Sequence, residues 1–318
     1  MAGIDEAGLG PVIGPLVVGC AAFEVPDEHL ESSLWERLEG AVCRRPARDR
    51  AMVAIDDSKR LYRSGRGLAD LERGVLAAAA VLGRAPARTS ELLSFLAGEP
   101  EAWTAGCPWY ADLDRPLPRL VAADEIAALT QGLQRQLEGA GSRLVVLSAE
   151  VLEAAELNDL VTAGATKADA AFGRVGRLLV RLVDIVGSGQ RLLVHLDRQG
   201  GRIRYRDQLG AVFPASFVWI LDESPAASRY RLEERGREVE IRVRVGCDRA
   251  QLPVALASML AKYLRELHME CLNRYFAGLV PGLEPTAGYP QDGRRFLAAV
   301  GPLLGRLGIA GRRLRRCR

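Results

Sequence analysis

Residues 3–15 read GIDEAGLGPVIGP, and the fold of the chain can be inferred outward from this segment. A short apolar run at 2–4 leads into two carboxylates and a turn built from glycine and proline. The run 12–23 that follows is rich in Val, Ile, Leu and Ala. We therefore expect a strand, a tight glycine turn and a second buried strand. Asp5 and Glu6 then stand where the first strand meets the turn.

Helical and strand-like segments alternate along the rest of the chain. Apolar residues repeat every four positions over 28–44 and over 68–83, a spacing that is typical of helices. The further expected helices cover 122–139, parts of 149–186, about 253–276, and a segment after 293; the expected strands cover 144–147, 191–197, 217–222 and a hairpin at 228–246. Residues 84–120 are rich in Pro, Gly and Trp, and we interpret them as a loop-dominated insertion that could act as a lid. The alternation favours an α/β fold with a mixed sheet flanked by helices.

Composition and charge narrow the class of protein. The 43 Lys and Arg residues against 40 Asp and Glu residues give a net charge of +3, and 48% of residues are hydrophobic, which excludes a disordered polyelectrolyte. Binding to nucleic acid would therefore need a local basic surface. No apolar run is long enough to span a membrane, and acidic residues stand where a signal peptide would be basic, so we expect a cytoplasmic protein, and a monomer. The six cysteines and three histidines have no zinc-site spacing.

Carboxylates at the ends of apolar strands carry the chemistry. The candidates are Asp5 with its neighbour Glu6, then Asp197, Asp222 and Asp248. Strand ends form the site crevice of an α/β sheet, and carboxylates without Cys or His partners select Mg²⁺ or Mn²⁺. Two such ions would stabilise the attacking and leaving oxygens of a phosphodiester displacement. The alternative for any one of these residues is a helix cap or a turn.

The opening motif resembles that of type II ribonuclease H (ribonuclease HII), G-[IV]-D-E-A-G-R-G-P-x-x-G-P. Five other segments are similar to segments of that family: 56–61 to D-S-K-K-L, 153–158 to E-I-D-x-x-N, 193–197 to the strand of the third acid, 248–262 to the D-x₅-[VI]-A-A-A-S-I-[LI]-A-K helix, and 288–290 to the G-Y-[GP] turn. The resemblance covers roughly 3–25, 54–63, 146–199 and 246–300. Residues 64–145 and 200–245 are outside it.

The resemblance implies a ribonuclease H-like catalytic domain over 1–250, with an insertion at about 64–145. A helical C-terminal region, 251–318, would pack on it, and its basic tail, 312–318, either adds affinity for phosphate or is only solvated. The implied activity is endonucleolytic cleavage, with Mg²⁺ or Mn²⁺, of RNA in RNA–DNA hybrids or of ribonucleotides in duplex DNA, as in DNA replication and repair. The products would carry 3′-hydroxyl and 5′-phosphate ends.

The resemblance also implies roles for individual residues. Asp5, Glu6, Asp197 and Asp248 would be the catalytic residues and metal ligands, with Asp222 as the competitor for one place; we prefer Asp248 because the helix after it carries Ser258 and Lys262. The substrate-binding residues would be Gly8, Leu9, Gly10, Ser58, Lys59, Ser258, Lys262 and Tyr289. Backbone groups of the glycine turn would read the ribose 2′-hydroxyl, since glycine lets the main chain approach a sugar closely, and the tyrosine would stack on the sugar.

Two positions depart from the family pattern. Leu9 replaces the arginine of the glycine turn, and Glu266 replaces an aspartate after Arg265. If the arginine side chain holds a phosphate, this chain has lost a cation there. Two alternatives therefore stay open: a nuclease-fold protein that binds hybrids without cutting them, and a related metal-dependent nuclease that acts on another substrate such as branched DNA.

Overall fold

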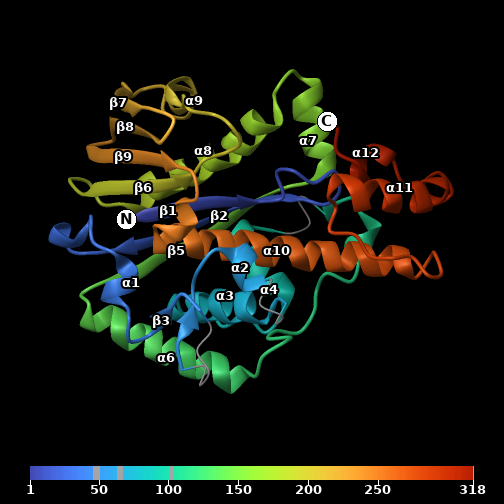
Figure 1. Ribbon diagram of the computed structural model, residues 1–318, viewed down its shortest axis with the longest axis horizontal. Helices are drawn as coiled ribbons and strands as arrows, with labels where there is room; N and C mark the ends of the chain where they lie inside the picture. The colour runs from blue at the N-terminus through green and yellow to red at the C-terminus, as the bar shows by residue number, and fades with distance from the viewer. Residues whose placement is uncertain (46–50, 63–66, 100–103, 318) are drawn as a thin grey trace.

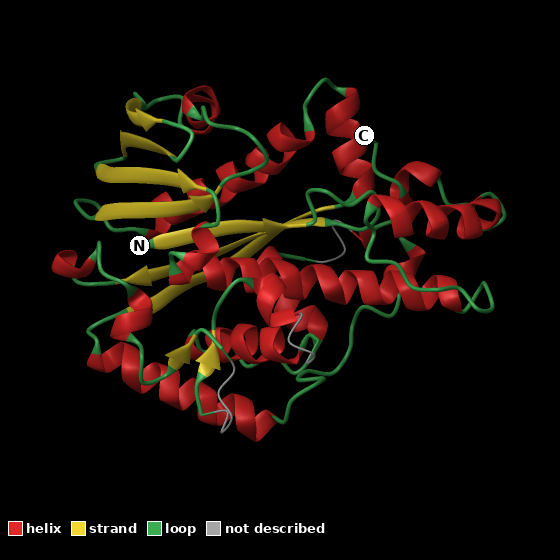
Figure 2. Ribbon diagram, in the orientation of Figure 1, coloured by secondary structure: helices red, strands yellow, loops and turns green. Residues whose placement is uncertain are grey.

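A seven-stranded mixed sheet forms the centre of the computed structural model, which describes residues 1–45, 51–62, 67–99 and 104–317 (Figure 2). The strand order is β5-β2-β1-β6-β9-β8-β7. The strands are β1 (Ala2–Ala7), β2 (Leu16–Glu24), β5 (Arg143–Leu152), β6 (Arg191–Asp197), β7 (Trp219–Glu223), β8 (Ala227–Glu234) and β9 (Arg237–Arg244). β6 is parallel to both β1 and β9, and the other pairs are antiparallel. The expected α/β fold with a mixed sheet is confirmed.

Helices cover both faces of this sheet (Figure 1). On β2, Val17 and Ala21 belong to one core and Val18 and Cys20 to the other, as strand alternation requires. The first core includes α3 (Ala69–Val81), α4 (Thr89–Ala97), α6 (Ala123–Gly139) and α10 (Leu252–Ala277); the second includes α8 (Lys167–Ile185) and α9 (Arg206–Val212). The remaining helices are α1 (Leu34–Arg37), α2 (Ser58–Tyr62), α7 (Ala154–Thr162), α11 (Pro290–Leu304) and α12 (Gly311–Leu314). Among the described residues, no helix is long and apolar enough to cross a membrane.

Helix α10 lies directly on β1 and β2 because glycines face it. A Cβ atom on Gly3 would lie 2.2 Å from the backbone nitrogen of Val254, and one on Gly19 would lie 2.2 Å from the carbonyl oxygen of Ala257. No other residue leaves room for the helix backbone at these points. The close approach brings Ser258 of α10 beside Asp5 of β1.

Most elements were predicted from the pattern, but the helix expected over 28–44 is wrong. That segment forms a single 3₁₀ turn η1 (Asp27–His29), the four-residue α1, and β3 (Val42–Cys43), which pairs with β4 (Val53–Ala54). Leu30, Leu34 and Leu38 are all buried, so their spacing marks burial and not a continuous helix. β5 also runs on to Leu152, where we expected a helix from 149.

The insertion at 84–120 contains α4 and the 3₁₀ turn η2 (Pro108–Tyr110), and it packs into the core. Trp109 and Tyr110 are buried in the core that contains α10, and the Trp109 ring lies 6.0 Å from that of Phe276. Residues 100–103 lie outside the described part of the chain. The interpretation of this segment as a lid is therefore wrong, because Trp109 and Tyr110 are fixed inside the molecule.

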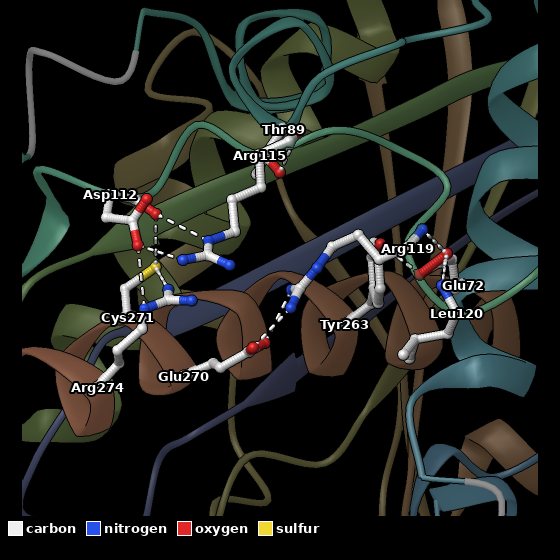
Figure 3. Close-up of polar contacts among 10 residues, drawn as sticks. All are labelled: Glu72, Thr89, Asp112, Arg115, Arg119, Leu120, Tyr263, Glu270, Cys271 and Arg274. Carbon is white, nitrogen blue, oxygen red and sulfur yellow. Dashed lines mark hydrogen bonds and ion pairs between the residues drawn. The ribbon is translucent and has the colours of Figure 1, made fainter. Parts of the chain in front are cut away.

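Polar contacts hold the same insertion to α3 and α10 (Figure 3). Arg119 donates two hydrogen bonds, of 2.8 and 2.5 Å, to the carboxylate of Glu270. The backbone N–H groups of Arg119 and Leu120 donate to Glu72, and Arg274 pairs with Asp112 at 3.1 Å. Bidentate arginine–carboxylate pairs fix orientation as well as distance. The insertion is thereby built into the body of the protein.

The basic tail is also part of the fold. Arg312 pairs with Asp159, and Arg313 donates to the carbonyl oxygen of Ala105. Arg316 is buried, with an exposed fraction of 1%. Arg316 is therefore not solvated, whereas Arg312 is exposed, and affinity of the tail for phosphate stays a prediction. Arg318 lies outside the described part of the chain.

Candidate active site

Three of the predicted carboxylates stand at neighbouring positions of the sheet, and a fourth lies in a turn that is hydrogen-bonded to it. Asp5 and Glu6 are on β1, and Asp197 is the last residue of β6. These strands are parallel, with Ile4 opposite Leu196, so Asp5 and Asp197 follow at adjacent points. Asp248 lies in the 3₁₀ turn η3 (Cys247–Arg249), whose Cys247 N–H donates a 2.7 Å hydrogen bond to Asp197. That bond ties the turn to the end of β6.

The pKa values of these carboxylates are raised, first by burial and then by one another. Burial, followed by the charges of Glu6, Asp197 and, more weakly, Asp248, raises the pKa of Asp5. Burial and Asp197 raise the pKa of Glu6 to about 7. Burial, together with Asp57 and Asp197, raises the pKa of Asp248 to about 6. Like charges close together disfavour ionisation, so the four groups form one electrostatic cluster.

Residues of the Asp-Ser-Lys segment and of α10 surround this cluster. Ser258 lowers the pKa of Asp5, and its hydroxyl lies 3.0 Å from the hydroxyl of Ser58. Lys59 is exposed, and its charge lowers the pKa of Glu6, Asp197 and Asp248, opposing the effect of burial. A compact ammonium beside several carboxylates is well placed to meet a phosphate.

The donor types in the cluster fit a hard divalent cation. Carboxylate oxygens are the ligands that Mg²⁺ and Mn²⁺ take in proteins, and the raised pKa values reflect negative charge that a cation would stabilise. In the part of the chain that the structure describes, no three His, Cys, Asp or Glu side chains converge closely enough to hold an ion as they stand. Binding would therefore draw the carboxylates together.

Asp222 lies apart from the cluster. It is on β7, which is separated from β6 by β9 and β8, and its side chain is exposed, with Ser224 donating to it at 3.3 Å. Neighbouring strands of a sheet lie ~4.8 Å apart, and β7 is three strands away from β6. Asp222 is therefore too far from Asp197 for both to bind the same ion. A surface hollow lined by Arg191 and Trp219 is at the opposite ends of these strands from Asp197.

The glycine turn is joined to the turn that carries Tyr289. Gly8 has φ of +97°, and a Cβ atom there would lie 2.6 Å from Nε of Arg265. The N–H of Val12, just past the turn, donates a 2.7 Å hydrogen bond to the carbonyl oxygen of Gly288. Tyr289 is 49% exposed, and Gly10 has open space around it. Two predicted substrate-reading elements are thus linked and open to solvent.

Leu9 and Lys262 have partners within the protein. Leu9 packs against the buried cluster that contains Leu16 and Leu157. The ammonium of Lys262 pairs with Glu266 at 2.5 Å and lies 4.6 Å from the centre of the Tyr62 ring. Its charge is therefore largely compensated by one carboxylate.

Two residues beside the site were missed in the sequence. Gln199 is buried and lowers the pKa of Glu6. Arg265 is buried between the two turns and donates to the carbonyl oxygens of Ala287, at 2.9 Å, and Ile13, at 3.4 Å. Gln199 follows Asp197 by two positions, which is the one pattern that could have found it; no local pattern marks a buried arginine within a helix.

Comparisons with known proteins give structural matches alone. No family model matches the chain, and no curated protein matches it. Among solved structures, ribonuclease HII from Archaeoglobus fulgidus, in its complex with PCNA, is 15% identical, with a TM-score of 0.43 over 100% of this chain and 93% of that one. Ribonuclease H2 from Pyrococcus horikoshii OT3 is 14% identical, with a TM-score of 0.43 over 98% and 90%. Bst-RNase HIII in complex with Mn²⁺ is 16% identical, with a TM-score of 0.44 over 99% of this chain and 65% of that one.

These three solved structures, to which the chain is similar in fold, are thus type 2 ribonucleases H, named HII, H2 and HIII.

Proposed function

We propose that the protein is a metal-dependent endonuclease that hydrolyses RNA in RNA–DNA hybrids or ribonucleotides embedded in duplex DNA. The observation that carries the proposal is the electrostatic cluster of Asp5, Glu6, Asp197 and Asp248 beside the glycine turn. The resemblance of residues 3–15 to the opening of ribonuclease HII supports the substrate class. Water adds across the phosphorus–O3′ bond, so one product ends in a 3′-hydroxyl and the other in a 5′-phosphate.

Each group of residues in the site has a separate role in binding the metal ion or the substrate. Mg²⁺ or Mn²⁺, held by the four carboxylates, would supply Lewis-acid activation of water and phosphate. Ser258 favours the ionised form of Asp5, and exposed Lys59 attracts the backbone phosphate. The glycine turn offers main-chain groups to the 2′-hydroxyl, the group that separates RNA from DNA. The exposed ring of Tyr289 can stack on the sugar next to it.

A second candidate function is binding of hybrids without cleavage. One observation favours it: Leu9, which replaces the arginine of the glycine turn, packs against apolar side chains and offers no cation to a phosphate. A binding protein of this kind would hold hybrids equally well in EDTA and after Asp197→Asn.

One experiment separates these functions and also tests an all-DNA substrate. Purified protein is incubated with an RNA–DNA hybrid, a DNA duplex containing one ribonucleotide, and a branched DNA junction, each with Mn²⁺ or with EDTA. Metal-dependent cleavage of the first two substrates supports the proposal. Retention of hybrids without cleavage supports the second candidate, and preferential cleavage of the junction supports a nuclease with a different substrate; either result contradicts the proposal.

A further inference from the structure

Arg316, in the C-terminal tail, contacts the glycine turn from inside the molecule. Its exposed fraction is 1%. Its Nη1 atom donates hydrogen bonds to the carbonyl oxygens of Gly8 and, at 3.4 Å, of Pro11. Its backbone N–H donates to the carbonyl oxygen of Val12 at 2.9 Å. Arg316, near the C-terminal end of the sequence, therefore binds three carbonyl oxygens near its N-terminal end.

Asn158 of α7 fixes the tail in this position. Its side-chain NH₂ group donates 2.8 Å hydrogen bonds to the carbonyl oxygens of Arg312 and Arg315. Its Oδ1 atom accepts a 2.7 Å hydrogen bond from the N–H of Cys317. The backbone is thus held on both sides of Arg316, so the guanidinium reaches the turn with little freedom. This is the arrangement expected of a supporting residue whose own position is set by further hydrogen bonds.

The burial of Arg316 is costly, and the charge of Glu153 offsets this cost only in part. No ion pair to Arg316 is found within residues 1–45, 51–62, 67–99 and 104–317 at hydrogen-bond range, and its Nε and Nη2 atoms have no hydrogen-bond partner there. Burial lowers its pKa to about 9, which records the cost of keeping the charge. Its hydrogen bonds go to the glycine turn and to Val12 directly after it.

The turn has no polar side chain of its own to hold it. Leu9 packs against the cluster that contains Leu16 of β2 and Leu157 of α7. Arg265 and Gly288 hold the following residues, Val12 and Ile13, but the carbonyl oxygen of Gly8 is bound by Arg316. The position of the first glycine therefore depends on the tail.

We propose that Arg316 is a positioning residue for the glycine turn, so that the C-terminal tail sets how well the turn recognises ribose. This inference rests on the proposed function for its effect on substrate, but its structural part, the order of the turn, can be measured without substrate or metal. A chain with Arg316 removed keeps the carboxylate cluster and loses the fixed turn. Substrate recognition falls, and the chemical step does not.

The test uses the full chain with Arg316→Met, which keeps length and apolar volume but removes every donor. Arg312→Met is the matched control, because Arg312 is in the same tail and pairs only at the surface, with Asp159. Hydrogen–deuterium exchange is measured without metal, comparing peptides over 8–15 with peptides over 252–277. Loss of charge-assisted hydrogen bonds to the turn should raise exchange over 8–15 by about tenfold in Arg316→Met and leave it unchanged in the control. Arg316→Lys, which keeps one donor, should restore part of the protection.

The same variants are then assayed on a duplex containing one ribonucleotide. We expect KM to rise by about tenfold for Arg316→Met, with kcat within about twofold of the wild-type value, since the lost contacts position substrate only. Equal exchange over 8–15 in all variants, or equal loss of protection over 252–277, would overturn the inference. If the wild-type protein cleaves no substrate, the proposed function fails, while the exchange data still decide whether the tail orders the turn.

Discussion

The pKa of Glu6 leads to a prediction about stability in the absence of metal. Glu6 has a pKa of about 7 in the folded protein against 4.5 for an ordinary glutamate, because it is buried and close to Asp197. Between these two values the folded state binds more protons than the unfolded state, so folding stability falls as pH rises. The loss starts near pH 4.5 and is complete above about pH 7. Glu6→Gln removes the titrating group and should remove this loss.

The size of the effect follows from the difference between the two pKa values. At about 1.4 kcal/mol for each pKa unit, the change from 4.5 to about 7 amounts to at most about 3 kcal/mol. The free energy of unfolding of Glu6→Gln should therefore exceed that of the wild type by up to about 3 kcal/mol at pH 8. At pH 4.5, where Glu6 of the folded wild type is protonated, its ionisation should contribute little to the difference in the free energy of unfolding.

Urea unfolding in EDTA across pH 4.5–8.5 measures this difference. Glu39→Gln is the control, because Glu39 is exposed and should give a difference that does not change with pH. Addition of Mn²⁺ at pH 8 should stabilise the wild type more than Glu6→Gln, since a cation that binds the folded state raises its stability. A difference between Glu6→Gln and wild type that is constant over the pH range would refute the reasoning, because it would show that Glu6 is not held protonated by its neighbours.

Three further predictions test the architecture and the roles of single residues. Gly19→Ala should destabilise the protein by about 3 kcal/mol in urea unfolding, because its Cβ would meet the backbone of α10, whereas Gly132→Ala, in open space within α6, should stabilise it by ~0.5–1 kcal/mol; equal effects would contradict the packing argument. Leu9→Arg should steepen the dependence of log K on log salt for hybrid binding by about 1, and an unchanged slope would mean that no phosphate lies near the turn. Asp248→Asn should lower kcat by about 100-fold or more, while Asp222→Asn should leave it within about twofold; the reverse order would exchange their roles.

The sequence predicted the parts of the site that depend on strand ends. The strand that carries Asp5, the glycine turn and the strand that ends at Asp197 follow from local hydrophobic pattern, which is set by burial. The helix expected over 28–44 failed for the same reason, since its leucines are buried without forming one helix. The local hydrophobic pattern predicts which residues are buried, but it does not predict which secondary structure connects them.

Other parts of the site depend on contacts between distant segments. The hydrogen bonds from Arg316 to the glycine turn join residues about 300 positions apart, and nothing near residue 316 indicates burial. The insertion at 84–120 was misread because Pro and Gly were taken to mark an exposed loop, while Trp109 within it fills the core. Such placements are decided by tertiary packing, which overrides local composition.

Cleavage of a DNA duplex that contains a single ribonucleotide is the most direct test of whether the carboxylate cluster makes this protein a metal-dependent nuclease. Single-turnover rates are measured with Mn²⁺ and with EDTA for the wild type and for Asp5→Asn, with Asp222→Asn as the control. With Mn²⁺, we expect the wild type and the control to cleave the duplex and to leave 3′-hydroxyl and 5′-phosphate ends. The rate for Asp5→Asn should be lower by about 100-fold or more, and no protein should cleave in EDTA. Cleavage that persists in EDTA, or a rate for Asp5→Asn equal to that of the wild type, would contradict this expectation.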